Sequence, residues 1–206
     1  HWRAYSLTCP AAPTADVIAI TVKAIPDGVV SGHIVRALRP GTLVALDQAT
    51  GDFVLPDPLP PRILFLTAGS GITPVAGMLR TLREEGRLGE VDVVVHHAAP
   101  RADEMIFAGL LRELDGAGLI RLIARHDDED GMLAMTDLET VVPDWRERQA
   151  WVCGPTGMLD AAEEHEDAMS APEVEPSPGA VQLLTVHAAK GLEWDATVVV
   201  DRKSVV

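Results

Sequence analysis

A short glycine-rich segment, Ala68-Gly69-Ser70-Gly71-Ile72-Thr73-Pro74, is the first place in the sequence where chemistry can be expected. It follows an apolar run at residues 63–67 and precedes a stretch with helical periodicity. Glycines in such a turn let the backbone approach a phosphate closely, and the helix start adds N–H donors and the positive end of a dipole. The segment therefore indicates a phosphate site, with a tight turn that only packs helix against strand as the alternative.

A second segment of this kind is Trp151-Val152-Cys153-Gly154-Pro155-Thr156-Gly157-Met158. Gly154 and Pro155 directly follow a buried strand pattern, so a ligand can lie across the carboxyl end of that strand, where parallel sheets bind ligands. Cys153 either faces a reactive ring or is a small buried hydrophobic residue, which is the usual state of a lone cysteine.

Two motifs nearer the start of the sequence combine a cation, an aromatic ring and hydroxyl groups. In Arg3-Ala4-Tyr5-Ser6 the arginine can hold a phosphate with paired donors, the tyrosine offers a flat face and the serine can hydrogen-bond a ring nitrogen or carbonyl. Gly28-Val29-Val30-Ser31 is a second candidate anion site at a helix start. The alternatives are an alternating strand with a solvated arginine, and a serine that only caps the helix.

The elements that must position these motifs fall into two regions. Before residue 56, strand patterns at 2–8, 17–23, 42–46 and 52–55 surround a helical pattern at 28–39. A proline-rich connector at 56–61 separates them from residues 62–165. There we expect strands at 63–67, 91–96, 119–124 and 150–153, and helices at 75–82, 106–114 and 158–164. Buried strands that alternate with amphipathic helices predict a parallel sheet covered on both faces.

Composition and charge limit the classes of function. The 206 residues suffice for one ordinary domain or slightly more, and their formal net charge of −14 gives no general attraction to nucleic acid or to an anionic membrane. No apolar run approaches the roughly 20 residues of a membrane span. The two cysteines, Cys9 and Cys153, cannot form a disulfide framework or a four-ligand zinc site, so we expect a cytoplasmic protein.

The ordered set of motifs resembles the ferredoxin–NADP reductase superfamily over about residues 1–165. The shared order is RxYS, GxVS, a proline-rich connector, GSGITP and CGPxxM. Within that superfamily the chain is most similar to modules that pass electrons from NAD(P)H through FAD to a ferredoxin-type iron–sulfur or other redox partner. The resemblance implies an α/β fold: a partial antiparallel flavin-binding β-barrel (1–55), incomplete because family members have strands before RxYS, then a Rossmann-like NAD(P)-binding domain (62–165).

The resemblance also implies roles for single residues. Arg3 would bind the flavin pyrophosphate, Tyr5 would stack on the isoalloxazine, and Ser6 would hydrogen-bond near its reactive nitrogen. The FAD phosphate site would be lined by Val30 and Ser31. The nicotinamide dinucleotide would be held by Gly69, Gly71, Ile72 and Thr73, with Cys153, Gly154, Pro155 and Met158 near the nicotinamide.

Catalysis is expected to depend on placement, because the flavin does the chemistry. Ser6 and Cys153 are the two candidate catalytic residues on this account. Arg101 follows the second sheet strand, where it would suit the 2′-phosphate of NADPH or be a solvated surface arginine. NADH and NADPH both stay open as donors.

A separate resemblance covers residues 181–195, which are similar to motif V of superfamily I DNA helicases of the UvrD type. It implies that Thr185 and His187 contact DNA and that Gly191 and Glu193 face a nucleotide, with Lys190 in the same motif. No Gly-x-x-x-x-Gly-Lys-[Ser/Thr] occurs in the chain, so we expect a fragment without motor activity and without a nucleic-acid partner.

The remaining segments complete the expected organisation. Residues 166–180 read as a linker, 181–200 as a fragment too short to bury its own core, and 201–206 as a non-native tail, because a common sequencing adapter encodes those six residues. We expect a truncated or chimeric reductase. The alternatives are a fragment of an ATP-dependent helicase and an inactive dinucleotide-binding remnant.

Histidines at the end of an expected strand raise the question of a metal. His96, His97 and His126 have no carboxylate or cysteine at ligand spacing beside the pair, so we expect hydrogen-bonded strand-end histidines and no metal. The acidic run at 127–131 lacks the ligand spacing of a calcium loop and is expected to be a solvated loop.

Overall fold

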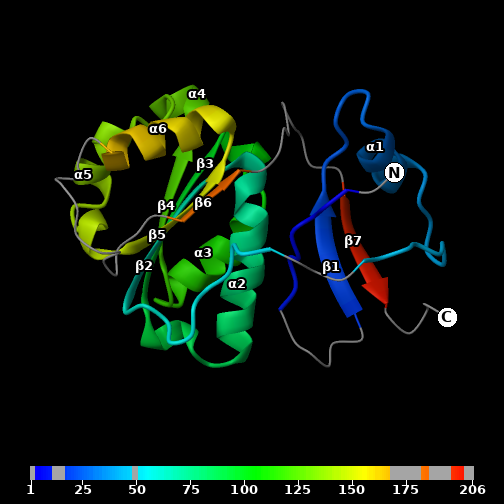
Figure 1. Cartoon of the computed structure of the whole chain (residues 1–206), viewed down its shortest axis with the longest axis horizontal. Coiled ribbons are helices and arrows are strands. Elements are labelled where there is room, and N and C mark those ends of the chain that lie inside the picture. Colours follow the sequence, from blue (N-terminus) through cyan, green and yellow to red (C-terminus); the bar gives the residue numbers. More distant parts are fainter. Residues whose placement is uncertain (1–2, 11–16, 48–50, 168–181, 186–195, 202–206) are drawn as a thin grey trace.

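The parallel sheet is the centre of the structure, a computed structural model that describes residues 3–10, 17–47, 51–167, 182–185 and 196–201. Helices cover both faces of this sheet, and a smaller region with a two-stranded sheet and one helix lies beside it (Figure 1). The elements in chain order are β1 (Val17–Val22), α1 (Val29–Arg36), β2 (Arg62–Ala68), η1 (Gly69–Gly71), α2 (Ile72–Glu84), η2 (Leu88–Glu90), β3 (Asp92–Ala99), η3 (Ala102–Glu104), α3 (Ala108–Gly116), β4 (Arg121–His126), α4 (Asp127–Asp130), η4 (Met135–Asp137), α5 (Leu138–Val141), η5 (Trp145–Glu147), β5 (Gln149–Gly154), α6 (Thr156–Asp167), β6 (Gln182–Thr185) and β7 (Ala196–Asp201).

The large sheet has the strand order β4-β3-β2-β5-β6, and all neighbouring strands are parallel. From β2 the chain first builds outward through β3 and β4, and then returns to add β5 on the other side of β2. The order therefore reverses between β2 and β5, which is the topological switch point where open parallel sheets bind ligands. The expected α/β architecture is confirmed.

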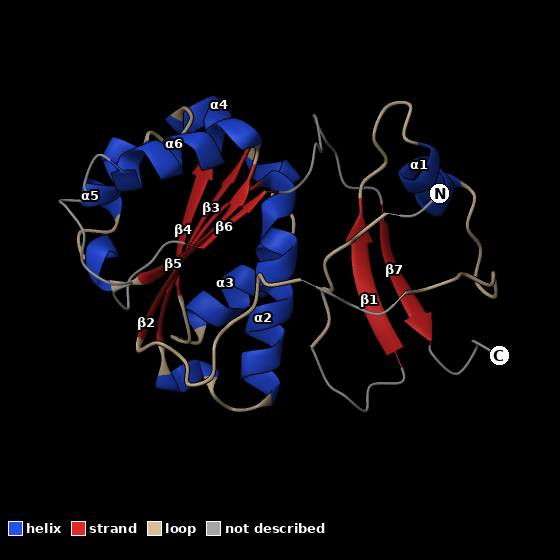
Figure 2. Cartoon of the chain, in the orientation of Figure 1, coloured by secondary structure: helices blue, strands red, loops and turns tan. Residues whose placement is uncertain are grey.

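Strand β2 is apolar on both faces because each face is covered by helices (Figure 2). Ile63 and Phe65 pack with the buried residues of α2 and α3. Leu64 and Leu66 pack on the opposite face with residues of α5 and α6. The full burial of β2 explains why its sequence shows a continuous apolar run instead of alternation.

Three strands expected before residue 56 are not regular strands, which corrects the sequence prediction. Residues 3–8 make one isolated bridge, Leu7 with Ile20, and residues 42–46 and 52–55 have no strand pairing. A β-branched sequence forms a ladder only where a partner strand is in register. Val54 instead accepts a hydrogen bond from the indole of buried Trp151 (3.2 Å).

The C-terminal strands pair with both regions. β6 runs parallel to β5, with Gly154 opposite Thr185, and β7 runs antiparallel to β1, with Val17 opposite Asp201. Residues 182–185 and 196–201 thus pair with strands of the two regions, which agrees with the expectation that 181–200 is too short to bury its own core. The predicted linker at 166–180 lies outside the described residues except for its first two, which belong to α6.

Two adjacent histidines are buried in β3 on opposite faces of the sheet. Thr67 Oγ1 lies 2.9 Å from His97 Nδ1, whereas neither ring nitrogen of His96 has a hydrogen-bond partner among the described residues. Burial is the main cause that lowers the pKa of each imidazole from 6.5 to about 4. The expectation of hydrogen-bonded histidines therefore holds for His97 only.

This pair predicts that the protein is destabilised by mild acid. Between pH 6.5 and 4 the unfolded chain binds more protons than the folded chain at these two positions, so the free energy of unfolding falls as pH falls, by several kcal/mol. Urea denaturation at pH 7.5 and pH 5 measures the difference. His96→Leu should reduce this pH dependence, and the matched change at exposed His33, His33→Leu, should not. An equal pH dependence in wild type and His96→Leu would contradict the prediction.

Candidate functional site

Two helix starts meet at the carboxyl edge of the sheet, one on each side of the switch point. β2 ends in η1 and α2, and β5 ends in Gly154, Pro155 and α6. The two strands are neighbours, with Thr67 opposite Cys153 at this edge. Gly71 is the N-cap of α2 and supplies no side-chain cap, and the Ile72 amide donates to the Ser70 carbonyl of η1. The arrangement suits an anion between the two helix starts.

Glycine is required where the two turns touch. A Cβ built on Gly71 would lie 1.8 Å from the Cys153 carbonyl oxygen, far inside van der Waals contact. At Gly154 the demand is weaker, because a Cβ there would lie 2.8 Å from Sδ of the flexible Met158 side chain, which can move. Gly69 has a φ of +52°, in the left-handed region that favours glycine. The glycine-rich segment therefore does pack helix against strand, as the alternative interpretation of its sequence states. The same close packing holds the turn at the edge of the sheet where a ligand would lie.

The predicted residues of this turn differ in what they can offer a ligand. Ile72 is fully buried in the core, so only its backbone can contact a dinucleotide. Thr73 is buried, and its hydroxyl donates to the Ser70 carbonyl (2.9 Å), which fixes the turn. Pro155 is exposed and Met158 is half-buried, so both have surface at the edge. The candidate contacts are thus mainly backbone groups plus the surface of the β5–α6 turn.

Cys153 is fully buried at the end of β5, and burial raises the pKa of its thiol to about 12. The thiol is therefore protonated at neutral pH and does not act as a nucleophile. Its carbonyl, which packs against Gly71, is the part that shapes the site.

These facts predict a difference in reactivity between the two cysteines. Iodoacetamide at pH 8 should label half-buried Cys9 and leave Cys153 unmodified in the folded protein, because alkylation needs an accessible thiolate. Mass spectrometry of the tryptic peptides measures the labelling. A Cys9→Ser variant is the control and should take up no label until it is unfolded. Rapid labelling of Cys153 in the folded protein would contradict the assignment.

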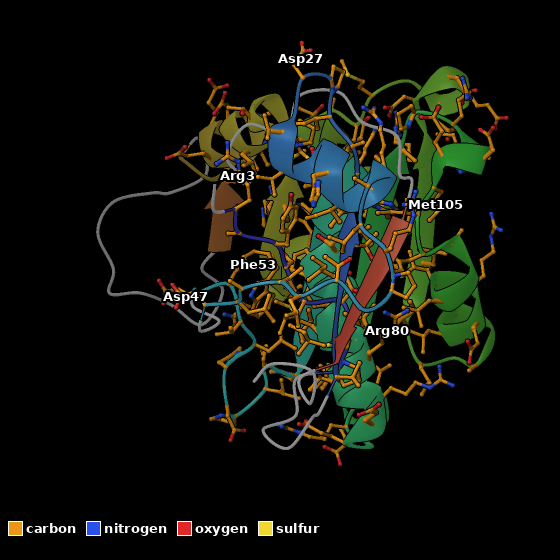
Figure 3. The ribbon with its side chains drawn as sticks, turned by 90° about the vertical axis from the view of Figure 1, so that its right-hand side faces the viewer. Arg3, Asp27, Asp47, Phe53, Arg80 and Met105 are labelled. Carbon is orange, nitrogen blue, oxygen red and sulfur yellow. The ribbon has the colours of Figure 1, made fainter. Side chains whose placement is uncertain are left out.

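The motifs of the smaller region lie around α1. Ser31 is buried, and its hydroxyl accepts a hydrogen bond from the Ile25 amide (3.2 Å) just before the helix. Val30 is half-buried in the first turn of α1. Arg3 is exposed, and the chain near it runs beside α1 (Figure 3). Burial raises the pKa of Tyr5, and the positive charge of Arg3 opposes that shift.

A contact outside the predicted motifs holds this N-terminal segment on α2. The Thr8 amide donates to the Ala19 carbonyl (2.8 Å), and Arg80 donates to the Thr8 carbonyl from the other side. A Cβ on Gly77 would lie 2.5 Å from the Leu7 carbonyl oxygen, so the helix needs glycine here. We call Gly77 and Arg80, with the backbone of Leu7 and Thr8, the α2 clamp. A glycine inside a helical pattern is the one sequence signal that points to it.

Arg101 lies at the end of β3 and is exposed. It forms ion pairs with Asp103 (3.2 Å) and Glu104 (3.1 Å). The hydrogen bond to Asp103 is the main cause that raises its pKa, so the guanidinium stays charged. A phosphate at this position would have to compete with two carboxylates.

Of the residues of the helicase-like motif, Thr185 ends β6 beside Gly154, and the other four lie outside the described residues. Those four are His187, Lys190, Gly191 and Glu193. Within the described ranges no group of three or more His, Cys, Asp or Glu side chains is arranged to hold a metal ion. Among the helices of those ranges, none has the length and apolar character needed to cross a bilayer.

Comparison with known proteins assigns the larger region. Residues 65–164 match the family model described as the oxidoreductase NAD-binding domain. The fold is also that of a ferredoxin–NADP⁺ reductase from Plasmodium falciparum, which superposes with a TM-score of 0.62 at 14% identity. The helicase resemblance finds no support in these comparisons.

Two curated relatives from Mycobacterium tuberculosis cover most of the chain. An NADPH oxidoreductase is 50% identical over 167 residues, which are 79% of this chain and 43% of the relative. A 3-ketosteroid-9-alpha-monooxygenase ferredoxin reductase component is 31% identical and covers 94% of this chain and 51% of its own length. The chain thus spans about half the length of these relatives.

A solved structure shows the same fold. The flavohem-like FAD/NAD-binding domain of nitric oxide dioxygenase from Vibrio cholerae superposes with a TM-score of 0.71 at 23% identity. The alignment covers 88% of this chain and 76% of that domain. The likeness extends beyond residues 65–164 and includes most of the smaller region.

Proposed function

We propose that this chain is the NAD(P)H- and flavin-binding part of a ferredoxin reductase-type oxidoreductase, which takes a hydride from NAD(P)H and passes electrons to a redox partner. The observation that carries the proposal is the site at the switch point, where Gly71 packs on the Cys153 carbonyl between two helix starts. An NAD-binding domain model covers this site.

The dinucleotide would lie across the carboxyl edge of β2 and β5. Its pyrophosphate would accept hydrogen bonds from the backbone of Gly69, Gly71 and the first turn of α2. The nicotinamide would lie near Gly154 and Pro155, and the adenosine end would extend toward β3 and Arg101. We favour NADPH as donor because a relative at 50% identity is named an NADPH oxidoreductase.

The residues of the smaller region fit FAD by their chemistry. Arg3 and the start of α1 at Val30 and Ser31 offer a cation and N–H donors for a pyrophosphate, and Tyr5 offers a half-buried aromatic face. Bound FAD supplies a ring that accepts a hydride and releases electrons singly. Ser6 would orient that ring by a hydrogen bond, and the α2 clamp would fix its distance from the nicotinamide site.

The proposed partner is a ferredoxin-type protein or an oxygenase component. The relatives include a ferredoxin reductase component of a monooxygenase and a glycine betaine monooxygenase reductase subunit from Chromohalobacter salexigens.

The visible absorption spectrum tests this function. The purified chain supplied with FAD should show an oxidised-flavin band that bleaches when NADPH is added without oxygen, and more slowly with NADH. A chain that binds FAD without bleaching would contradict hydride transfer. A chain that binds NADPH and stays colourless would be a dinucleotide-binding remnant.

A further inference from the structure

Phe107 has a backbone conformation that its side chain does not favour. Its φ of +56° and ψ of +16° lie in the left-handed region, where a bulky non-glycine residue is rare and strained. Phe107 is also the N-cap of α3, where Ser, Thr, Asp or Asn would give the helix a hydrogen bond that a phenyl ring cannot. Strain of this kind persists only where the surrounding contacts impose it, and it concentrates at functional sites. The reason for a phenylalanine at this position therefore lies in the contacts of its ring.

The ring of Phe107 faces the guanidinium of Arg80. Arg80 Cζ lies 5.3 Å from the centre of the ring, within the range of a cation–π interaction. Arg80 belongs to α2 and follows Gly77 by three residues, so both lie on one side of the helix. The same guanidinium donates a hydrogen bond to the Thr8 carbonyl. Arg80 therefore connects the start of α3 with the N-terminal segment, across the helix α2 that lies between the parallel sheet and the smaller region (Figure 1).

The Phe107 ring is suited to hold Arg80 in place. The ring is half-buried and packs against the core that β2, α2 and α3 share, so its own position is fixed. An arginine side chain loses rotamer freedom when it is held in one conformation, and attraction to an aromatic face offsets part of that cost. None of the ion pairs among the described residues includes Arg80. Within this part of the chain the ring, and no carboxylate, thus orients the guanidinium.

We propose that Phe107 is a positioning residue for hydride transfer. Its ring holds Arg80 on the Thr8 carbonyl, and this hydrogen bond in turn fixes the segment that carries Tyr5 and Ser6. The inference rests on the proposed function, because Tyr5 and Ser6 affect the reaction only where they contact a flavin.

The N-terminal segment depends on this contact because it has little regular pairing of its own. In residues 3–8 one isolated bridge joins Leu7 to Ile20, and the Thr8 amide donates to the Ala19 carbonyl. A segment released at the Thr8 carbonyl can shift by about 1 Å, which is enough to misplace a reacting ring.

The test compares two substitutions of Phe107 in the full chain supplied with FAD. Leucine keeps apolar bulk but offers no aromatic face to the cation, whereas tyrosine keeps that face. In Phe107→Leu the rate of flavin reduction by NADPH should fall about fivefold or more, while the Kd of NADPH stays within about twofold of wild type. Hydrogen exchange at the Thr8 amide should become about threefold faster or more. Phe107→Tyr should match the wild type in all three measurements.

Two controls separate the contact with Arg80 from packing of the core. Phe53 is likewise half-buried against this core, so Phe53→Leu makes the same change elsewhere and should alter neither the exchange at Thr8 nor the rate of reduction. In an Arg80→Leu background, Phe107→Leu should add no further change to the exchange at Thr8, because the ring acts through Arg80.

Exchange at the Thr8 amide needs no NADPH and no hydride transfer, so it separates this inference from the proposed function. If NADPH fails to reduce the flavin of the wild type, the proposed function fails, and faster exchange in Phe107→Leu still supports the hold of the ring on the segment. Unchanged exchange in Phe107→Leu, an equal rise in Phe53→Leu, or a further rise in the Arg80→Leu background overturns the inference and leaves the ring a core residue. Faster exchange with an unchanged rate of reduction also overturns it, since the segment would then not position the flavin.

Discussion

Replacement of Gly71 by alanine is expected to weaken NADPH binding about 100-fold or more. The new Cβ would lie 1.8 Å from the backbone carbonyl oxygen of Cys153, which no side-chain rotation can relieve. η1 and the start of α2 must therefore move away from β5 by more than about 1 Å, a displacement large enough to misplace the donors that hold a pyrophosphate. Isothermal titration with NADPH measures the loss.

Gly109→Ala is the matched control for this substitution. Gly109 lies in α3, and a Cβ there has nothing within 4 Å, so binding should stay at the wild-type value. The free energy of unfolding should fall by about 1–3 kcal/mol in Gly71→Ala, and it should hold or rise by up to about 1 kcal/mol in Gly109→Ala. NADPH binding by Gly71→Ala at wild-type strength would contradict the proposed site.

Gly77→Ala is expected to separate dinucleotide binding from hydride transfer. The added Cβ would lie 2.5 Å from the Leu7 carbonyl oxygen, so α2 can no longer pack on the segment that carries Tyr5 and Ser6. Gly71 lies at the start of α2, away from the contact that Gly77 makes with Leu7. The turn at Gly71 should therefore still bind NADPH within about twofold of wild type. The rate of flavin reduction should fall about 10- to 100-fold, because the two rings lose their alignment.

Stopped-flow absorbance measures the rate of flavin reduction, and hydrogen exchange at the Thr8 amide reports the clamp itself. Arg80→Leu removes the donor to the Thr8 carbonyl. It should change the rate of flavin reduction and the exchange at the Thr8 amide in the same directions as Gly77→Ala does. Gly116→Ala, at a position with open space, is the control and should leave both unchanged. A parallel loss of NADPH affinity and reduction rate in Gly77→Ala would show that the contact has only a structural role.

Local patterns predicted the parts of the fold that local chemistry determines. The apolar run at 63–67 and the glycines after it predicted β2, the turn and α2, because a strand buried on both faces has no polar positions. The acidic run after β4 was expected to be a solvated loop, and its residues Asp127–Asp130 form the short exposed helix α4. Propensity alone does not separate one helical turn from a loop.

Contacts between distant segments could not be predicted in this way. The pairing of β7 with β1 and of β6 with β5 joins residues far apart in the chain, and no local pattern specifies such a partner. The α2 clamp likewise depends on backbone carbonyls of Leu7 and Thr8, which have no sequence signature. Only Gly77 indicated that another segment of the chain approaches α2 closely, because glycine lowers helix stability and needs such a reason.

The most direct test of the central claim is an amide NMR titration of the chain with NADP⁺. We predict that the largest shifts occur at Gly69, Gly71 and Gly154, on the two turns that flank the switch point. The opposite, amino edge of the sheet has an open depression of about 200 Å³ at the starts of β3 and β4, lined also by the residues just before each strand, and it serves as the internal comparison. Shifts concentrated at that depression, around Gly118 and Arg121, or the absence of any shift at the two turns, would contradict the account.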